Sequence, residues 1–199
     1  MITGIILAGG ASSRMGRDKA RLPVGSHLLI DVVLRRLRPR VDRLLVIGNA
    51  ENVRELRYLP VDAVLTDVRP ARGPLMGLYT GLMHSETDWN LCVPCDMPWI
   101  DDRLLARLLA HRRAWVALVA SLHPVDGPQP FPLLCRTGVC RTIGALLDSG
   151  ERALQVLLRC PEARLVRVEE PELLRSFANL NTAAQYDEFI HDHTLALRF

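Results

Sequence analysis

The chain has 199 residues, and at about 100–200 residues per domain this length favours one domain spanning residues 1–199. Hydrophobic residues make up 49% and charged residues 24% of the chain, which is typical of a soluble globular protein and excludes disordered, collagen-like and coiled-coil chains. The formal net charge of +3 is too small to indicate a nucleic-acid binder, so we expect no nucleic-acid partner.

Strands and helices are predicted to alternate along the first part of the chain. The apolar run at 3–8 is typical of a strand buried on both faces, and a glycine-rich loop follows it at 9–18. A helix is expected from the N-cap Ser26 to Arg38, because Pro39 disfavours its continuation. Further strands are predicted at 43–47, 63–66, 90–93 and 115–120. Further helices are predicted at 51–57, starting at Gly73, and starting after Asp101, which would be its N-cap. This βαβαβαβαβ order requires a parallel sheet with right-handed crossovers.

The rest of the chain has a less regular pattern. Residues 124–132 are rich in proline and predict a loop, and residues 131–135 predict an edge or antiparallel strand. The elements predicted after these are helices at 138–147 and 153–158, a strand at 164–168 and a last helix from about Thr182. We therefore expect one three-layer α/β domain with a mostly parallel, twisted sheet.

No targeting or membrane-spanning segment is predicted, and we expect a cytoplasmic protein without a membrane partner. The first residues lack the basic start of a signal peptide, and the longest clearly apolar stretch, 114–122, is far shorter than the roughly 20 residues of a membrane span. The five cysteines are an odd number, which favours reduced thiols over a disulfide framework. Cys92 and Cys95 have redox or metal spacing, but no second pair of this kind exists, so we expect buried thiols.

The loop after the first strand carries the strongest chemical signal. Its glycines, Gly9, Gly10 and Gly16, allow the backbone to approach a ligand closely and to aim N–H groups at it. Arg14 and Lys19 add positive charge, so the segment has the chemistry of a triphosphate cradle. Its spacing matches neither the P-loop nor the dinucleotide Gly-x-Gly-x-x-Gly pattern, and a glycine-rich turn with solvated charges is the alternative.

Lys19 is the only lysine among the 25 basic residues of the chain. An ammonium group is a compact point charge, whereas a guanidinium group is a wide planar fork. A compact charge fits between adjacent phosphate oxygens where a fork would clash. The retention of lysine at this one position therefore favours a functional role over a solvated charge.

Residues 7–19 read Leu-Ala-Gly-Gly-Ala-Ser-Ser-Arg-Met-Gly-Arg-Asp-Lys and resemble the signature of the molybdenum cofactor guanylyltransferases, a family of the nucleotidyltransferase superfamily. Further matches follow in order at 73–77, 94–98, 129–130 and 177–182. The resemblance covers most of the chain and is stronger before residue 112 than after it. It implies the Rossmann-like fold of the nucleotidyltransferases.

Asp96 directly follows a predicted strand and lies between Pro94 and Pro98, which restrict the direction of its carboxylate. A triphosphate substrate brings Mg²⁺, which binds one or two protein carboxylates together with phosphate oxygens and water. From the residues alone, an aspartate that stabilises the turn is an equal alternative. The family resemblance implies that Asp96 binds Mg²⁺.

The resemblance also assigns residues to the nucleotide. The groups expected to hold its phosphates are the backbone N–H groups of Leu7, Ala8, Gly9 and Gly10 and the side chains of Arg14 and Lys19. Asn49 and Asp67 each follow a predicted strand and would contact the nucleotide, with a turn or cap residue as the alternative. Gly73 and Gly77 flank a helix start whose N–H donors could receive an anionic group, with close helix packing as the alternative.

Asn179 and Asn181 match an Asn-x-Asn pattern that resembles residues lining the family's site on the pterin side or near the metal. The family continues with Asn-Thr-Pro-Glu-Asp, whereas this chain has Asn-Thr-Ala-Ala-Gln at 181–185 and so lacks the proline and both acids. Thr182 can still cap the helix that follows.

The resemblance implies an enzyme that binds GTP and Mg²⁺ and transfers GMP to the terminal phosphate of molybdopterin, releasing pyrophosphate. Arg14, Lys19 and Asp96 would be its catalytic residues, acting by alignment and charge neutralisation without a catalytic base. The Leu-Ala-Gly-Gly start resembles the guanine-selecting branch, and molybdoenzymes or other cofactor-biosynthesis proteins are the protein partners to consider. The alternatives are a related nucleotidyltransferase using CTP or a sugar phosphate, and a non-catalytic GTP-binding protein that delivers the cofactor.

Overall fold

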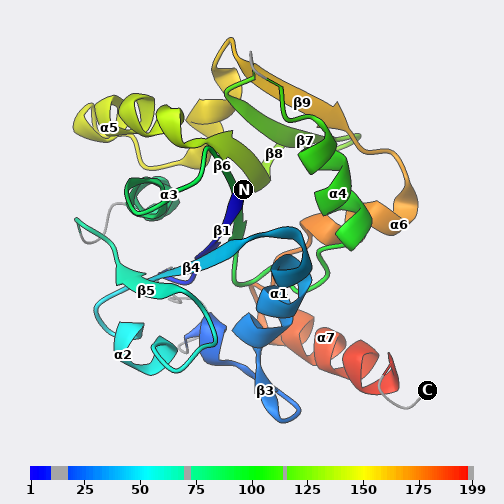
Figure 1. The fold of residues 1–199 in the computed structure, drawn as a ribbon. Helices are drawn as coiled ribbons and strands as arrows, with labels where there is room; N and C mark the ends of the chain where they lie inside the picture. Colours follow the sequence, from blue (N-terminus) through cyan, green and yellow to red (C-terminus); the bar gives the residue numbers. More distant parts are fainter. Residues whose placement is uncertain (10–17, 70–72, 114–115, 197–199) are drawn as a thin grey trace.

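A seven-stranded sheet forms the centre of the molecule, and helices cover both of its faces (Figure 1). The computed structural model describes residues 1–9, 18–69, 73–113 and 116–196, with side chains through Asp192. The strands in spatial order are β5 (Ala63–Thr66), β4 (Arg43–Gly48), β1 (Ile2–Leu7), β6 (Trp89–Pro94), β8 (Gly127–Arg136), β7 (Leu118–His123) and β9 (Ala163–Arg167). The predicted three-layer α/β fold is confirmed.

The sheet is mostly parallel, as predicted. β1 is parallel to its neighbours β4 and β6, β4 is parallel to β5, and β7 is parallel to β9. Among the described strands of this sheet, only β8 runs antiparallel to its neighbours, which are β6 and β7. Leu7 at the end of β1 is in register with Ile47 of β4 and Pro94 of β6, so these strands end at one edge. In open α/β sheets, ligands bind outside this carboxyl edge.

The sheet divides the hydrophobic core into two layers, and helices cover each layer. In chain order the helices are α1 (Leu29–Leu37), α2 (Val53–Leu56), α3 (Gly73–Met83), α4 (Asp102–Ala110), α5 (Cys140–Asp148), α6 (Pro171–Leu174) and α7 (Ala183–Ala196). α1 and α4 cover one face of the sheet, whereas α3 and α5 cover the other (Figure 1). Successive strand residues point to opposite faces, so Ile6 joins the first layer and Ile5 and Leu7 join the second.

The helix predicted from Ser26 to Arg38 is confirmed as α1, but its predicted start is wrong. Pro23–Val24 (β2) pair with His27–Leu28 (β3) as a small hairpin, and Ser26 lies in its turn. Val24 is buried in a cluster with residues of α7, and this packing favours the hairpin over an earlier helix start. α1 therefore begins at Leu29.

The loop predicted at 124–132 is also wrong, because β8 begins at Gly127. Among the described residues, this half of β8 pairs with β7 alone, since its pairing with β6 is confined to 133–136. A proline lacks the N–H group that a second neighbouring strand would need, so Pro128 and Pro130 are compatible with this half of the strand. Of the two alternatives for 131–135, the antiparallel strand is confirmed.

Two smaller differences occur in the second half of the chain. The helix predicted at 153–158 is a 3₁₀ helix at Leu154–Arg159, and the sequence does not predict α6. The strand predicted from Trp115 begins at Leu118, and Trp115 itself lies outside the described residues.

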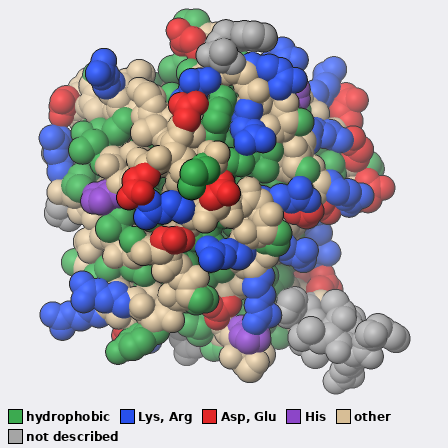
Figure 2. All heavy atoms as spheres, in the orientation of Figure 1, with side chains coloured by type: hydrophobic (Ala, Val, Ile, Leu, Met, Phe, Trp, Pro, Cys, Tyr) green, Lys and Arg blue, Asp and Glu red, His purple; other side chains and the backbone are tan. Residues whose placement is uncertain are grey.

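The surface carries both signs of charge. In Figure 2, basic and acidic side chains are interspersed over the face shown, in agreement with the small net charge. Arg35 and Arg36 of α1 are exposed, as expected for a solvated helix face. Of the helices described, none is both long and apolar enough to cross a membrane.

Candidate functional site

The carboxyl edge of the sheet brings together three predicted site residues from distant parts of the chain. Asp96 follows β6, Lys19 opens the 3₁₀ turn Lys19–Arg21, and Asn181 precedes α7. The Lys19 Nζ atom donates to Asp96 Oδ2 and to Asn181 Oδ1, both at 2.8 Å. The side chains of Lys19 and Asp96 are 18% and 19% exposed, so water screens their ion pair less than it would on an open surface.

Backbone hydrogen bonds fix the position of Asp96. The N–H group of Cys95 donates to the Leu7 carbonyl at 3.0 Å, and the N–H group of Leu180 donates to the Asp96 carbonyl at 2.9 Å. The loop that carries Asp96 is therefore bonded to the end of β1 on one side and to the Asn-x-Asn segment on the other.

The start of α7 holds Asn181 in place despite its departure from the family pattern. The Gln185 side-chain oxygen accepts the N–H groups of Asn181 at 2.8 Å and Thr182 at 3.0 Å. In return, the Thr182 hydroxyl accepts the Gln185 N–H group at 3.2 Å. This is a capping box, and it confirms Thr182 as the cap of α7. Gln185 thus supplies the acceptor that the lost acids could have provided.

Asn179 has a polar atom without a partner. Its side-chain oxygen Oδ1 is buried and has no hydrogen-bond partner among the described residues. A buried amide oxygen in this state gains from a ligand that supplies a donor or a cation. Leu180, between Asn179 and Asn181, is bonded to the Asp96 carbonyl, so this oxygen belongs to the segment docked on the Asp96 loop.

The backbone donors expected to hold phosphates are partly used by the sheet. Leu7 is the last residue of β1, and the Ala8 N–H group donates to the Ile47 carbonyl at 2.7 Å, so it is not available to a phosphate. A Cβ atom at Gly9 would lie 3.3 Å from the Gly48 backbone, so glycine allows the end of β1 to approach β4. Gly10 and Arg14 lie outside the described residues.

Asp67 follows β5 and is partly buried. Its Oδ1 atom is buried without a hydrogen-bond partner among the residues that the structure describes. Burial raises the pKa of the Asp67 carboxyl to about 6, and a hydrogen bond with the Thr80 side chain opposes this rise. Gly77 leaves space beside the carboxyl, because a Cβ atom there would lie 3.6 Å from Oδ1 and 3.1 Å from Leu7 Cδ2.

The start of α3 is packed against another loop. Gly73 has φ of +73°, and a Cβ atom there would lie 2.9 Å from the Arg152 carbonyl oxygen. The same carbonyl accepts the Leu75 N–H group at 3.2 Å. At least one of the helix N–H groups that we expected to receive an anion is therefore used within the protein.

Asn49 organises the turn after β4. Its side-chain oxygen accepts the N–H groups of Glu51 and Asn52, both at 2.9 Å. This is the turn role that the sequence left open as an alternative. Since the oxygen is engaged, a nucleotide contact by Asn49 would fall to its side-chain nitrogen.

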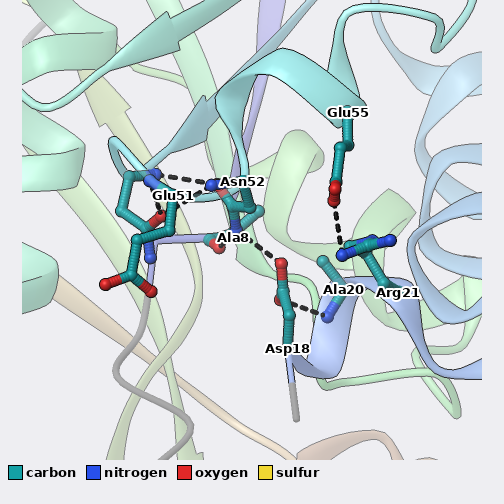
Figure 3. A network of polar contacts seen from close by, with 8 residues as sticks. Ala8, Asp18, Ala20, Arg21, Glu51, Asn52 and Glu55 are labelled. Carbon is teal, nitrogen blue, oxygen red and sulfur yellow. Dashed lines mark hydrogen bonds and ion pairs between the residues drawn. The ribbon is translucent and has the colours of Figure 1, made fainter.

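Asn52 is a residue of this site that the sequence analysis does not select. Its side-chain nitrogen donates to the Ala8 carbonyl at 2.8 Å and to Asp18 Oδ2 at 2.9 Å (Figure 3). The only available signal is a polar residue beside the apolar Val53, and polar residues at helix starts are common.

The cysteine pair has no sign of metal or redox chemistry in its surroundings. Cys92 and Cys95 are both buried, and burial raises the pKa of each thiol, which keeps it protonated. The expectation of buried thiols is confirmed. Within the described residues, no group of three or more His, Cys, Asp or Glu side chains is arranged to hold a metal.

Comparisons with known proteins identify the family of the chain. The model of the MobA-like NTP transferase domain matches residues 4–168. A molybdenum cofactor guanylyltransferase from Vibrio parahaemolyticus serotype O3:K6 is 35% identical over 188 residues, which are 93% of each chain.

Solved structures share the fold at lower identity. The molybdopterin-guanine dinucleotide biosynthesis protein A of Archaeoglobus fulgidus has a TM-score of 0.79 at 20% identity, covering 99% of this chain and 100% of that one. Rv0371C of Mycobacterium tuberculosis, in complex with manganese, has a TM-score of 0.68 at 22% identity, covering 96% and 97%. The family model and the sequence relatives confirm the resemblance carried by residues 7–19, and the chain belongs to the family of MobA-like NTP transferases.

Proposed function

We propose that this chain transfers GMP from GTP to the terminal phosphate of molybdopterin and releases pyrophosphate. The observation that carries the proposal is the convergence of Lys19, Asp96 and Asn181 at the carboxyl edge of the sheet. The Lys19 Nζ atom lies 2.8 Å from a side-chain oxygen of each of the other two residues. A cation, a carboxylate and an amide oxygen at the end of the glycine-rich segment suit a metal-bound triphosphate. The names of the sequence relatives supply the base and the acceptor.

The residues present fit a divalent metal ion such as Mg²⁺. Asp96 offers a carboxylate, and Asn179 has a buried amide oxygen without a partner among the described residues. These are hard oxygen donors, and a magnesium site that uses one or two carboxylates takes its other ligands from phosphates and water. When bound, the metal would neutralise negative charge at the reacting phosphate. We propose Asp96 as its protein ligand.

Lys19 and its neighbours would align the triphosphate. The Lys19 ammonium is oriented by Asp96 and Asn181 and would place one compact positive charge against phosphate oxygens. Arg14 and the Gly9–Gly10 backbone complete the proposed phosphate-binding set. The attacking group would be a phosphate monoester, whose second pKa is about 6, so it is mostly ionised at neutral pH and needs no base from the protein.

Asp67 would contribute to binding the nucleotide. Its buried Oδ1 atom lacks a partner among the described residues and can accept an N–H or O–H group from a ligand. A donor brought by the nucleotide would satisfy this oxygen and favour the ionised carboxylate. Asn49, Gly73 and Gly77 belong to the same proposed nucleotide side of the site.

The test is pyrophosphate release measured over a matrix of nucleotides and acceptors, with and without Mg²⁺. We expect release only with Mg²⁺ and molybdopterin together, and at least tenfold faster with GTP than with CTP. If pyrophosphate release were as fast or faster with CTP in place of GTP, or with a sugar phosphate in place of molybdopterin, the chain would catalyse a related reaction instead. GTP binding without pyrophosphate release would instead indicate a delivery protein. A cytoplasmic location and transfer of the product to molybdoenzymes or other cofactor-biosynthesis proteins belong to the same proposal.

A further inference from the structure

Asn52 connects the two ends of the glycine-rich segment. Ala8 directly precedes residues 9–17 and Asp18 directly follows them. The single side-chain nitrogen of Asn52 donates to the Ala8 carbonyl at 2.8 Å and to Asp18 Oδ2 at 2.9 Å. Figure 3 shows the Asn52 side chain lying between these two residues. The separation of the two ends is therefore set by one amide group.

Both polar atoms of the Asn52 side chain are hydrogen-bonded within the protein. Its residue exposure is 3%, and its side-chain oxygen accepts the Asn49 N–H group at 2.9 Å. The side chain does not cap α2, although it lies directly before that helix. Only an amide supplies two N–H donors and one acceptor in this volume, so aspartate or leucine at position 52 would leave buried polar groups unpaired.

Asp18 extends the connection to Lys19. Its second oxygen, Oδ1, accepts the Ala20 N–H group at 3.0 Å and so caps the turn on which Lys19 lies. Arg21 follows Ala20 in the same turn, and its Nη1 atom lies 2.5 Å from Glu55 Oε2 of α2. That ion pair is about half exposed and is worth little, because water screens it. The partly buried hydrogen bond between Asn52 and Asp18 is the stronger contact between the start of α2 and this turn.

We propose that Asn52 is a positioning residue that holds both ends of the phosphate-binding segment and, through Asp18, orients Lys19. This inference rests on the proposed function, because the segment matters only if a nucleotide binds there. Asn52 acts through Ala8 and Asp18 and need not touch the substrate. The same fixed ends serve the substrate and the transition state, so loss of the connection weakens binding of both equally.

The test compares Asn52→Leu with wild type in GTP titrations and in steady-state pyrophosphate release. Asn52→Leu removes the donors without changing the charge. We expect the Kd and KM for GTP to rise at least tenfold, with kcat changed by less than threefold. A variant that merely folds less well would behave differently, because a smaller active fraction lowers apparent kcat and leaves KM unchanged. That second pattern, or a KM within twofold of wild type, would overturn the inference.

Exchanging the amide and the carboxylate between positions 52 and 18 provides a rescue experiment. Asn52→Asp alone should raise the KM for GTP at least as much as Asn52→Leu, since it places a second carboxylate beside Asp18. Asp18→Asn combined with Asn52→Asp restores a hydrogen bond between the two positions in the opposite direction, and should recover at least fivefold of the lost affinity. If Asn52→Leu does not fold, the double variant tests the proposal instead. A KM for GTP in the double variant that is no lower than that of Asn52→Asp would contradict the proposal.

The matched control is Glu55→Gln on the same helix, which removes the exposed ion pair with Arg21. Its KM should stay within twofold of wild type, and a loss as large as that of Asn52→Leu would overturn the assignment to Asn52. Failure of the proposed function has a separate signature: the wild-type chain itself would then release no pyrophosphate from GTP and molybdopterin.

Discussion

Two aspartates follow strands at the same edge of the sheet, but their surroundings differ. Asp96, after β6, forms an ion pair with the Lys19 ammonium at 2.8 Å. Asp67, after β5, has a buried oxygen without a hydrogen-bond partner among the described residues, and burial raises its pKa to about 6. β4 and β1 lie between the two strands, so the two aspartates follow strands that are not adjacent in the sheet.

This difference separates two kinds of ligand contact. A carboxylate that already lies against a cation suits a site that binds a metal ion and phosphate oxygens. A partly buried carboxylate with one unsatisfied oxygen gains most from a neutral donor, because a hydrogen bond offsets the cost of burying its charge. We therefore associate Asp96 with the metal and the reacting phosphate, and Asp67 with recognition of the nucleotide.

The largest effect is expected at Asp96. Asp96→Asn keeps the size of the side chain and removes the charge, so Mg²⁺-dependent pyrophosphate release should fall at least about 100-fold. The measurement is the steady-state rate at saturating GTP, molybdopterin and Mg²⁺. Asp88→Asn, which changes an exposed aspartate, is the matched control and should change the rate less than twofold. A rate for Asp96→Asn within tenfold of wild type would show that Asp96 is not the protein ligand of the metal.

The next largest effect is expected at Lys19. Lys19→Ala should lower kcat/KM at least tenfold, and Lys19→Arg should not restore it, because a planar fork cannot take the place of a compact charge. Arg21→Lys in the same turn is the control and should be neutral. Full activity in Lys19→Arg would show that charge alone is sufficient and would contradict the role given to the shape of the ammonium.

A smaller, pH-dependent effect is expected at Asp67. The folded-state pKa of about 6 lies above the unfolded value near 3.8, so this group favours folding below pH 4 and loses that contribution as pH rises through 6. Asp67→Asn removes the titration, so relative to wild type it should be more stable at pH 7.5 than at pH 5, by of the order of 1 kcal/mol after allowance for partial exposure. Urea unfolding at both pH values measures this.

The same Asp67→Asn variant should weaken GTP binding severalfold, since the carboxylate acceptor is lost. Asp148→Asn, at an exposed ion pair, provides the stability control and should show no such pH dependence. An equal pH dependence in Asp67→Asn and wild type would indicate that Asp67 is solvated.

The smallest effect is expected at the start of α7. Gln185→Ala removes the acceptor for the Asn181 and Thr182 N–H groups and should lower the free energy of unfolding by about 1 kcal/mol, with activity reduced less than threefold. Gln185→Glu retains the acceptor and should remain close to wild type. Denaturant unfolding tests both variants, and equal stability of Gln185→Ala and wild type would show that the capping box contributes nothing.

The sequence predicts the strands β1, β4 and β5 better than it predicts β8 and the hairpin of β2 and β3. The strands ending at Leu7, Gly48 and Thr66 are apolar runs bounded by Gly, Asn or Asp, and local pattern is enough to find them. β8 was missed at its proline-rich start, because its pairing with a single neighbour there depends on the assembled sheet. The hairpin at 23–28 was missed for a similar reason, since its packing against α7 is a long-range contact.

The site was predicted in part from motifs and in part not at all. Lys19 and Asp96 lie in recognisable motifs, but their direct contact, and the contact of Lys19 with Asn181, join positions 77 and 162 residues apart, which spacing cannot reveal. The use of the Ala8 N–H group by β4 reduces the phosphate donors that the sequence suggested. Asn52 carries no motif, because its role depends on two chain ends that meet only in the folded protein.

Manganese binding tests the central claim most directly. Electron paramagnetic resonance of Mn²⁺ titrated into the wild-type chain with GTP should show one bound ion per chain, and Asp96→Asn should lose that binding while Asp67→Asn retains it. Equal binding of Mn²⁺ by wild type and Asp96→Asn in the presence of GTP would contradict the account.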